Sequence, residues 1–160
     1  MPLISLRIKA SLENVTKLAP TSVDDFQWFL KLKCTSCGEE TEKFVAFSVE
    51  DEHPLKGGRG SANMVYKCKL CSRENSIDIV KDSLLPYENQ DNQFSKLITF
   101  DCRGLEPTAF DFSEGWMCEG LETGTKFMDV DLSDDWAEYD EKGKCTVGVY
   151  EKGFEFVKQK

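Results

Sequence analysis

The sequence predicts an all-β fold, either a sandwich or an elongated distorted barrel. Apolar and polar residues alternate with a period of two along several segments, which is typical of strands with one buried face. Helical periodicity is poor along the 160 residues, and the strand candidates are numerous enough for two packed layers or a barrel. Two CxxC motifs additionally predict one metal site within this β structure.

The expected strands can be placed in chain order from this alternation. It is clearest over residues 4–12 and again over residues 26–34, where the second segment runs into the first CxxC motif. Further strands are expected over residues 44–49, 64–68, 77–80, 97–102, 126–132, 145–150 and 154–158. Longer loops are expected over residues 50–60 and 82–93. The acidic stretch 133–142 is expected to form at most a short helix or a turn.

Length and composition predict a single zinc-binding β domain over residues 1–160. The chain is long enough for one hydrophobic core, and 40% of its residues are hydrophobic. A short echo, Leu12-Glu13-Asn14 against Leu105-Glu106-Pro107, suggests two similar β halves. Their approximate bounds are 1–85, which carries the metal motifs, and 94–160, which is acidic.

Four cysteines give the most specific chemical signal. Cys34 and Cys37 lie in KCTSCGE, and Cys68 and Cys71 lie in KCKLCSRE. Each CxxC turn brings two thiolates to one side of a backbone reversal, and two such turns complete a tetrahedral site for one zinc ion. Because 30 residues separate Cys37 from Cys68, we expect the two turns on separate hairpins. Four protein ligands leave no position for water or substrate, so the zinc is predicted to be structural.

Other interpretations of these cysteines are ordinary buried thiols, two disulfides, or a thioredoxin-like redox pair. The redox motif requires a βαβ setting, and no helix is expected after either CxxC motif. The sequence has seven cysteines, so Cys102, Cys118 and Cys145 cannot all pair once four are assigned to zinc. This favours a reducing compartment, and for each of the three we expect a small, partly buried hydrophobe.

The chain carries no pattern that targets it to a membrane. Residues 1–15 alternate apolar and charged side chains, unlike a secretory signal, and no run approaches the roughly 18 apolar residues of a membrane span. We therefore expect a soluble cytosolic protein, with the nucleus as a second compatible location.

Charge is distributed unevenly along the chain, whose net charge is −9. Residues 31–73 contain eight Lys or Arg and six Asp or Glu, whereas residues 101–140 contain twelve acidic and two basic residues. The basic residues Lys33, Lys67, Lys69 and Arg73 flank the CxxC motifs and can compensate the negative charge of a zinc ion with four thiolates. Nucleic-acid binding, which needs a net positive surface, is therefore not expected.

No catalytic residues can be assigned from the sequence. His53 is the single histidine and is expected in a loop, without a Ser, Cys or acid partner placed by a motif. Trp116 and Trp136 lie in acidic, turn-like surroundings, where each either contacts a partner or covers one end of the core. The sequence thus predicts no enzyme.

Several uncommon phrases carry a resemblance over nearly the full chain: LKLKCTSCGEE, LKGGRGSANMVYKCKLCSRENSI, FDCRGLEP and DWAEYDEK. In this order they resemble the eukaryotic CXXC-motif-containing zinc-binding protein family, a conserved family without an established reaction. The resemblance implies an all-β architecture of two related halves around a pseudo-two-fold axis. It also implies one zinc ion bound by Cys34, Cys37, Cys68 and Cys71.

Two hypotheses for function follow. The first is a monomeric, non-enzymatic, zinc-stabilised interaction module whose acidic second half suits a basic protein partner. The alternative is a metal-handling or thiol-redox protein that uses exchangeable zinc or reactive cysteines.

Overall fold

The computed structural model describes residues 3–55 and 60–159, and the predicted all-β class is confirmed. The strands are β1 (Leu3–Glu13), β2 (Val15–Pro20), β3 (Trp28–Cys34), β4 (Val45–Phe47), β5 (His53–Pro54), β6 (Ser61–Ala62), β7 (Met64–Lys67), β8 (Glu74–Val80), β9 (Ser95–Arg103), β10 (Leu105–Asp111), β11 (Trp116–Gly120), β12 (Lys126–Val130), β13 (Trp136–Asp140) and β14 (Cys145–Lys158). A 3-10 helix, η1 (Lys81–Ser83), follows β8. No helix in the described part of the chain is long and apolar enough to cross a membrane.

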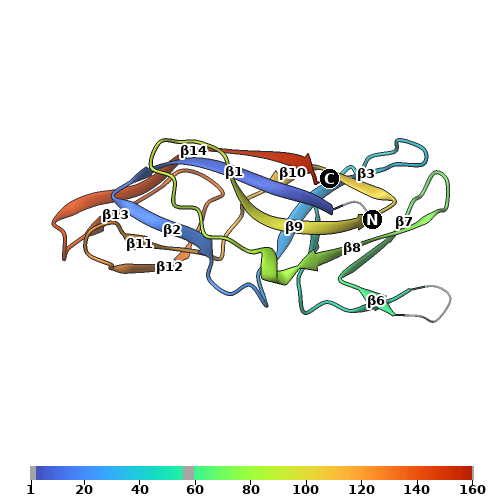
Figure 1. Ribbon diagram of the computed structural model, residues 1–160, viewed down its shortest axis with the longest axis horizontal. Coiled ribbons are helices and arrows are strands. Elements are labelled where there is room, and N and C mark those ends of the chain that lie inside the picture. The colour runs from blue at the N-terminus through green and yellow to red at the C-terminus, as the bar shows by residue number, and fades with distance from the viewer. Residues whose placement is uncertain (1–2, 56–59, 160) are drawn as a thin grey trace.

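The molecule is elongated, and its strands form one large and two small antiparallel sheets. The large sheet has six strands in the order β13-β14-β1-β9-β8-β7, and it curls along the length of the molecule (Figure 1). The small sheets have the orders β10-β3-β4 and β12-β11-β2 and lie toward opposite ends (Figure 1). A two-stranded ribbon, β5-β6, completes the structure.

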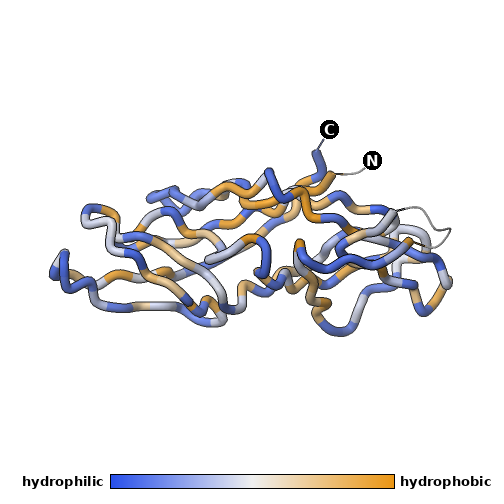
Figure 2. Tube along the Cα trace, turned by 90° about the horizontal axis from the view of Figure 1, so that it is seen from below, coloured by the Kyte–Doolittle hydropathy of each residue, from blue (hydrophilic) through white to orange (hydrophobic). Residues whose placement is uncertain are grey.

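Buried aromatic rings connect the two small sheets to each other and to the large sheet. Trp28 in β3 and Trp116 in β11 have no exposed surface, and Phe26 contacts both edge-on, at centroid distances of 4.6 and 5.3 Å. Trp28 also meets Phe100 of β9 at 5.7 Å. Such edge-to-face contacts add to the stabilisation from burial alone. Figure 2 shows hydrophobic positions along the strands and mostly hydrophilic turns at both ends.

The expectation of a helix or turn over residues 133–142 is wrong, because this segment contains β13. The strand pairs with β14 from Trp136 opposite Val149 to Asp140 opposite Cys145. It is an edge strand, and its three central residues Ala137, Glu138 and Tyr139 are all exposed, so they show no alternation of buried and exposed side chains. The strand forms through its main-chain hydrogen bonds to β14. Such pairing leaves no hydrophobic periodicity in the sequence from which the strand could be predicted.

The two strands expected over residues 145–150 and 154–158 are one continuous strand, β14. Its pairing with β1 shifts register between Lys9 and Ser11, and Glu151 has a positive φ of 53°. A bulge of this kind adds one residue to one strand and interrupts the period-two pattern. Strands β2, β10 and β11 were also not expected from the sequence.

The short sequence echo occupies different positions in its two strands. Leu12 and Glu13 end β1, whereas Leu105 and Glu106 begin β10. These matches therefore do not align the two segments. Trp116, expected in a turn, is a fully buried residue of β11, and Trp136 is half-buried on β13, where its ring meets Phe127 at 5.6 Å.

Candidate functional site

The two CxxC motifs lie on separate turns, as their spacing predicts. Cys34 ends β3, and Cys37 lies in the turn that follows; Cys68 follows β7, and Cys71 lies in the turn before β8. In the first turn the Cys34 N–H donates to the Glu39 carbonyl at 2.8 Å, and in the second the Cys68 N–H donates to the Arg73 carbonyl at 2.9 Å. Each turn is closed by main-chain bonds, which fixes the direction of its cysteine side chains.

The geometry of the four sulfur atoms fits a tetrahedral zinc ion. All four Sγ atoms lie within 4.8 Å of one another. Cys34 Sγ is 3.7 Å from Cys71 Sγ, and Cys37 Sγ is 3.5 Å from Cys68 Sγ. A tetrahedron with Zn–S bonds of about 2.3 Å has S–S edges of about 3.8 Å. The four cysteines are therefore free thiols arranged at the spacing that zinc requires.

Main-chain groups favour the thiolate form at the first cysteine of each pair. The N–H of Cys37 lowers the pKa of Cys34 to about 6, and the N–H of Cys71 lowers the pKa of Cys68. At Cys37, an exposed residue, the Glu39 N–H also lowers the pKa, but desolvation of the sulfur and the neighbouring sulfurs outweigh it and raise the pKa to about 12. The closeness of the four sulfur atoms thus opposes the ionisation of further thiols until a cation compensates the negative charge. Zn²⁺ supplies such a charge.

Two residues that sequence reasoning missed support the cluster from one side. The buried Asn75 donates from Nδ2 to Cys34 Sγ at 3.5 Å. Gly104 has a positive φ of 82°, and a Cβ at this position would overlap the Asn75 side chain. The Gly104 carbonyl also accepts a 3.0 Å hydrogen bond from the N–H of Thr35. The phrases that carry the resemblance contain both residues, but their contact joins two distant segments.

The remaining cysteines lie outside the cluster. Cys102 and Cys118 are fully buried, and burial raises the pKa of each thiol to about 12. Thiols of this kind are poor nucleophiles, in line with the expected role as small hydrophobes. Cys145 begins β14 and is partly exposed. In the described part of the chain, Cys34, Cys37, Cys68 and Cys71 are the one metal-compatible group of three or more Cys, His or acidic side chains.

Comparison with known proteins identifies the family. A family described as CXXC motif containing zinc binding protein, eukaryotic, matches residues 5–157. The chain belongs to this family. Proteins with the same name from Xenopus laevis and Homo sapiens are 53% identical over 156 residues and 50% identical over 157 residues. These alignments cover 96% and 97% of the chain and 97% and 98% of the relatives.

A solved structure gives the same result for the fold. The crystal structure of C1orf123 has a TM-score of 0.92 and 49% sequence identity, and the match covers 98% of this chain and 99% of that one. The predicted cofactor, zinc, is confirmed for this chain. Zinc is bound through the four-cysteine cluster of Cys34, Cys37, Cys68 and Cys71.

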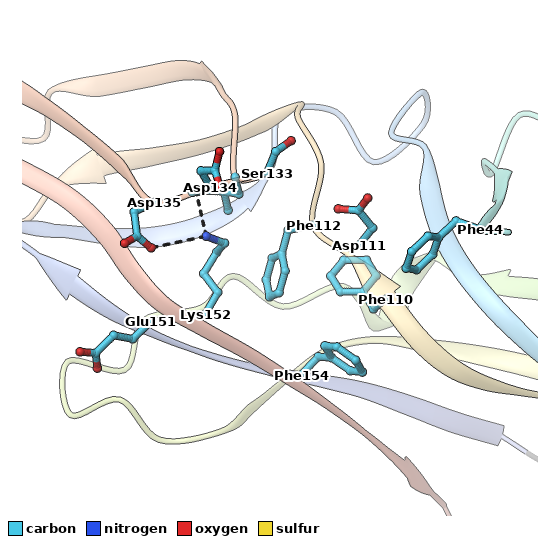
Figure 3. Close-up of a pocket in the computed structure, with 11 residues that line it drawn as sticks. Phe44, Phe110, Asp111, Phe112, Ser133, Asp134, Asp135, Glu151, Lys152 and Phe154 are labelled. Carbon is cyan, nitrogen blue, oxygen red and sulfur yellow. Dashed lines mark hydrogen bonds and ion pairs between the residues drawn. The ribbon is translucent and has the colours of Figure 1, made fainter.

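A second feature is a groove of about 760 Å³ at the junction of β10, β14 and the loop before β13 (Figure 3). Among the described residues its apolar lining is Leu132 and four phenylalanine rings, of which Phe110 and Phe112 are nearly buried and Phe44 and Phe154 are 38% and 37% exposed. Its polar lining is Asp111, Ser133, Asp134, Asp135, Glu151 and Lys152.

In the part of the chain that the structure describes, Lys152 is the single cation that lines this groove, and its charge is already engaged. Its Nζ donates to the Asp134 carbonyl at 2.9 Å and lies 3.9 Å from an Asp135 carboxylate oxygen (Figure 3). Nζ also lies 5.9 Å from the centre of the Phe112 ring. Only 10% of the Lys152 side chain is exposed. The surface that the groove offers to solvent is therefore aromatic and acidic.

The single histidine contributes to neither feature. His53 is exposed on the short strand β5. The acidic pair Asp24 and Asp25 is also exposed, and Asp24 forms an ion pair with Lys81 across the surface.

Proposed function

We propose that this protein is a non-enzymatic, intracellular interaction module that receives a basic segment of a protein partner in the groove between β10 and β14. The observation that carries this proposal is the combination of exposed phenylalanine rings with an acidic rim. Phe44 and Phe154 offer apolar surface, and Asp111, Asp134, Asp135 and Glu151 line the same groove. A segment with Lys or Arg beside an apolar side chain matches both properties.

Charge selects the kind of partner. Within residues 3–55 and 60–159, four carboxylates line the groove against one lysine, which is itself paired with Asp135. Approach of an acidic segment would be repelled, whereas a basic segment gains attraction at long range and cation–π contacts at short range. The acidity of residues 101–140 extends this preference beyond the groove.

The zinc cluster and the groove are formed by different residues. The cluster lies at the turns after β3 and β7, whereas the groove is lined mainly by residues of β10 and β14 and the loop before β13. A closed four-thiolate site does not offer zinc an open position for substrate. The free thiols are compatible with a reducing compartment, for which we propose the cytosol, with the nucleus as a second location.

We also infer that the single domain consists of two similar halves related by a pseudo-two-fold axis. The two halves correspond strand by strand: β1 to β9, β2 to β10, β3 to β11, β4 to β12, β7 to β13 and β8 to β14. Exchanging each strand for its counterpart gives the order of the six-stranded sheet in reverse, so that every pair of neighbouring strands is kept. The same exchange converts the sheet β10-β3-β4 into β2-β11-β12. Trp28 and Trp116, the first residues of β3 and β11, correspond under this exchange and are both fully buried.

Binding to the groove can be tested with a defined probe. A short fluorescent peptide of alternating Lys and Leu is titrated with the zinc-loaded protein, beside a peptide in which Glu replaces each Lys. We expect saturable binding of the basic peptide alone, weakened about tenfold by the double variant Asp134→Asn, Asp135→Asn. The matched control, Asp24→Asn with Asp25→Asn, removes the same charge outside the groove and should bind like the unaltered protein.

Two results would contradict the proposal. Equal affinity for the basic and acidic peptides would remove the role of charge. Equal weakening by both double variants would show that net charge, and not the groove, determines binding. Phe154→Ala adds a test of the apolar contact, because it removes an exposed ring without changing charge.

Exchange of zinc is the second candidate function, and the exposure of Cys37 and Cys71 favours it. Exposed ligands give a competing chelator direct access to the metal. Transfer of zinc to a chromogenic chelator within seconds, without unfolding, would support exchange. Release that occurs only at the rate of unfolding would remove this candidate.

A further inference from the structure

We infer that Gly120, Thr123, Asp140 and Gly143 form a metal-free counterpart of the zinc centre, in which hydrogen bonds to one carboxylate join two turns as zinc joins their equivalents. The inference rests on the proposed relation between the halves and goes beyond it, because it assigns a role to a cluster outside both the zinc site and the groove. It also predicts a latent site for a second zinc ion.

The turns themselves correspond bond by bond. In the zinc-bearing turn, Cys34 N–H donates to Glu39 O at 2.8 Å, and Gly38 N–H donates to Cys34 O at 2.8 Å. In the turn between β11 and β12, the same two bonds run from Gly120 to Thr125 at 2.7 Å and from Gly124 to Gly120 at 2.9 Å. Gly38 and Gly124 also share a positive φ, 83° and 72°.

A third bond anchors each turn to a neighbouring strand connection. Thr35 N–H donates to Gly104 O between β9 and β10, and Leu121 N–H donates to Asn14 O between β1 and β2. The two distances are 3.0 and 2.9 Å. Gly104 and Asn14 both have positive φ, 82° and 57°. Equivalent bonds at equivalent places therefore relate residue 34 to residue 120.

The turns that follow β7 and β13 correspond in the same way. Cys68 is the last residue before the turn between β7 and β8, and Asp140 is the last residue before the turn between β13 and β14. Four residues further on, Ser72 and Lys144 both have positive φ, 64° and 53°. Positions 68 and 71 thus correspond to positions 140 and 143, with the two-residue spacing of a CxxC motif.

The four counterpart positions converge in space. A Cβ built on Gly120 would overlap Thr123 Oγ1 and lie 2.8 Å from Asp140 Oδ2. A Cβ built on Gly143 would lie 3.0 Å from Thr123 Cγ2 and 3.3 Å from Asp140 Oδ2. Neither glycine has a positive φ, so a side chain is compatible with the backbone at both positions.

Hydrogen bonds occupy the place that zinc takes in the first half. The Asp140 residue is 2% exposed, and its carboxylate accepts from Thr123 Oγ1 at 2.7 Å and from Thr125 Oγ1 at 3.0 Å. It also accepts from the main-chain N–H groups of Lys142 and Gly143, at 3.1 and 3.3 Å. One buried anion with these donors joins the β11–β12 turn to the β13–β14 turn.

The direct test is to build the second metal site. In a Cys145→Ser background, Gly120→Cys, Thr123→Cys, Asp140→Cys and Gly143→Cys together place four thiols at the counterpart positions. We expect native mass spectrometry to find two zinc ions per chain in this variant. A matched control with Asp140→Ser and the other changes retained should bind one. One zinc ion in the folded four-thiol variant would overturn the inference.

A second measurement needs no substitution and decides the matter if the four-thiol variant fails to fold. After zinc is removed from the unaltered protein, amide hydrogen exchange is followed at the four turns. The inference predicts faster exchange at Gly38 and Ser72, with Gly124 and Lys142 still protected. Equal loss of protection at all four amides would overturn it. Neither experiment depends on peptide binding, so failure here is distinct from failure of the proposed function.

Discussion

Cys34 Sγ lies 3.7 Å from Cys71 Sγ, although 37 positions separate the two residues in the sequence. Main-chain hydrogen bonds close each of their turns. Among the residues that the structure describes, hydrogen bonds link the turn after β3 directly to the turn after β7 only through the cysteine sulfurs. We therefore propose that the role of zinc is to hold these two turns together. Apparent binding of a structural zinc is worth about 10 to 16 kcal/mol, comparable with the stability of a whole domain.

Replacing one ligand should remove the metal and destabilise the fold. We expect Cys34→Ser and Cys68→Ser to lower zinc content from one ion per chain to well below one and to lower the melting temperature. Cys145→Ser is the matched control, because Cys145 lies outside the cluster and should leave zinc content unchanged. Elemental analysis and thermal unfolding measure both effects, and full zinc occupancy in Cys34→Ser would contradict the assignment.

Gly104→Ala should weaken the zinc centre without touching a ligand. The new methyl group overlaps Asn75, which donates to Cys34 Sγ, and the positive φ of 82° adds strain of about 1 to 2 kcal/mol. Gly60→Ala is the control for strain alone, since Gly60 has a φ of 79° and no atom of the described residues within 4 Å of the added Cβ. We expect faster transfer of zinc to a chelator for Gly104→Ala than for Gly60→Ala; equal rates would show that Asn75 does not support the site.

Asp140→Asn should flatten the acid dependence of stability. Hydrogen bonds, first from Thr123, lower the folded-state pKa of Asp140 below its ordinary value of 3.8. The ionised carboxylate therefore stabilises the fold above the ordinary pKa, and this contribution is lost as pH falls through the lowered folded-state pKa.

We thus expect the stability difference between the unaltered protein and Asp140→Asn to be largest near neutral pH and to shrink below about pH 4. Loss of zinc in acid affects both proteins alike. Urea unfolding across this range measures the difference, and exposed Glu141→Gln is the control of equal charge change. A difference that stays constant with pH would contradict the role of the Asp140 carboxylate.

Tyr87→Phe should destabilise the core through unpaired main-chain groups. Tyr87 is 1% exposed, and its hydroxyl donates to the Gln93 carbonyl at 2.7 Å and accepts from the Ala10 N–H at 3.2 Å. Losing this hydroxyl should lower the free energy of unfolding by about 1 to 3 kcal/mol. Tyr139→Phe, at a residue that is 55% exposed, should cause little change in the same urea titration. Equal effects of the two changes would refute this account.

The fold class and the metal site can be predicted from sequence because both depend on local patterns. Alternation over residues 4–12 requires only that one face of β1 is buried, and a CxxC motif requires only one turn. Strand β13 escapes prediction because an edge strand with exposed Glu138 and Tyr139 has no such alternation. Its partner β14 was expected as two strands because a bulge in the middle of β14 interrupts the alternation of apolar and polar residues.

The remaining functional features depend on residues that are distant in sequence. Phe44, Phe110 and Phe154 line the groove from three segments that are far apart in the sequence. In the sequence Asp140 cannot be told apart from the other acidic residues of the stretch 101–140, which contains twelve. Its hydrogen bonds to Thr123 and Thr125 are seen only in the folded structure. Tertiary contacts, and not local motifs, define these sites.

The most direct test of the structural role of zinc is the melting temperature of the protein with one bound zinc ion and after verified removal of the metal. We predict a clear decrease on removal, with recovery when stoichiometric zinc is returned. An unchanged melting temperature in a sample shown to be zinc-free would contradict the role of the Cys34, Cys37, Cys68 and Cys71 site in holding the fold together.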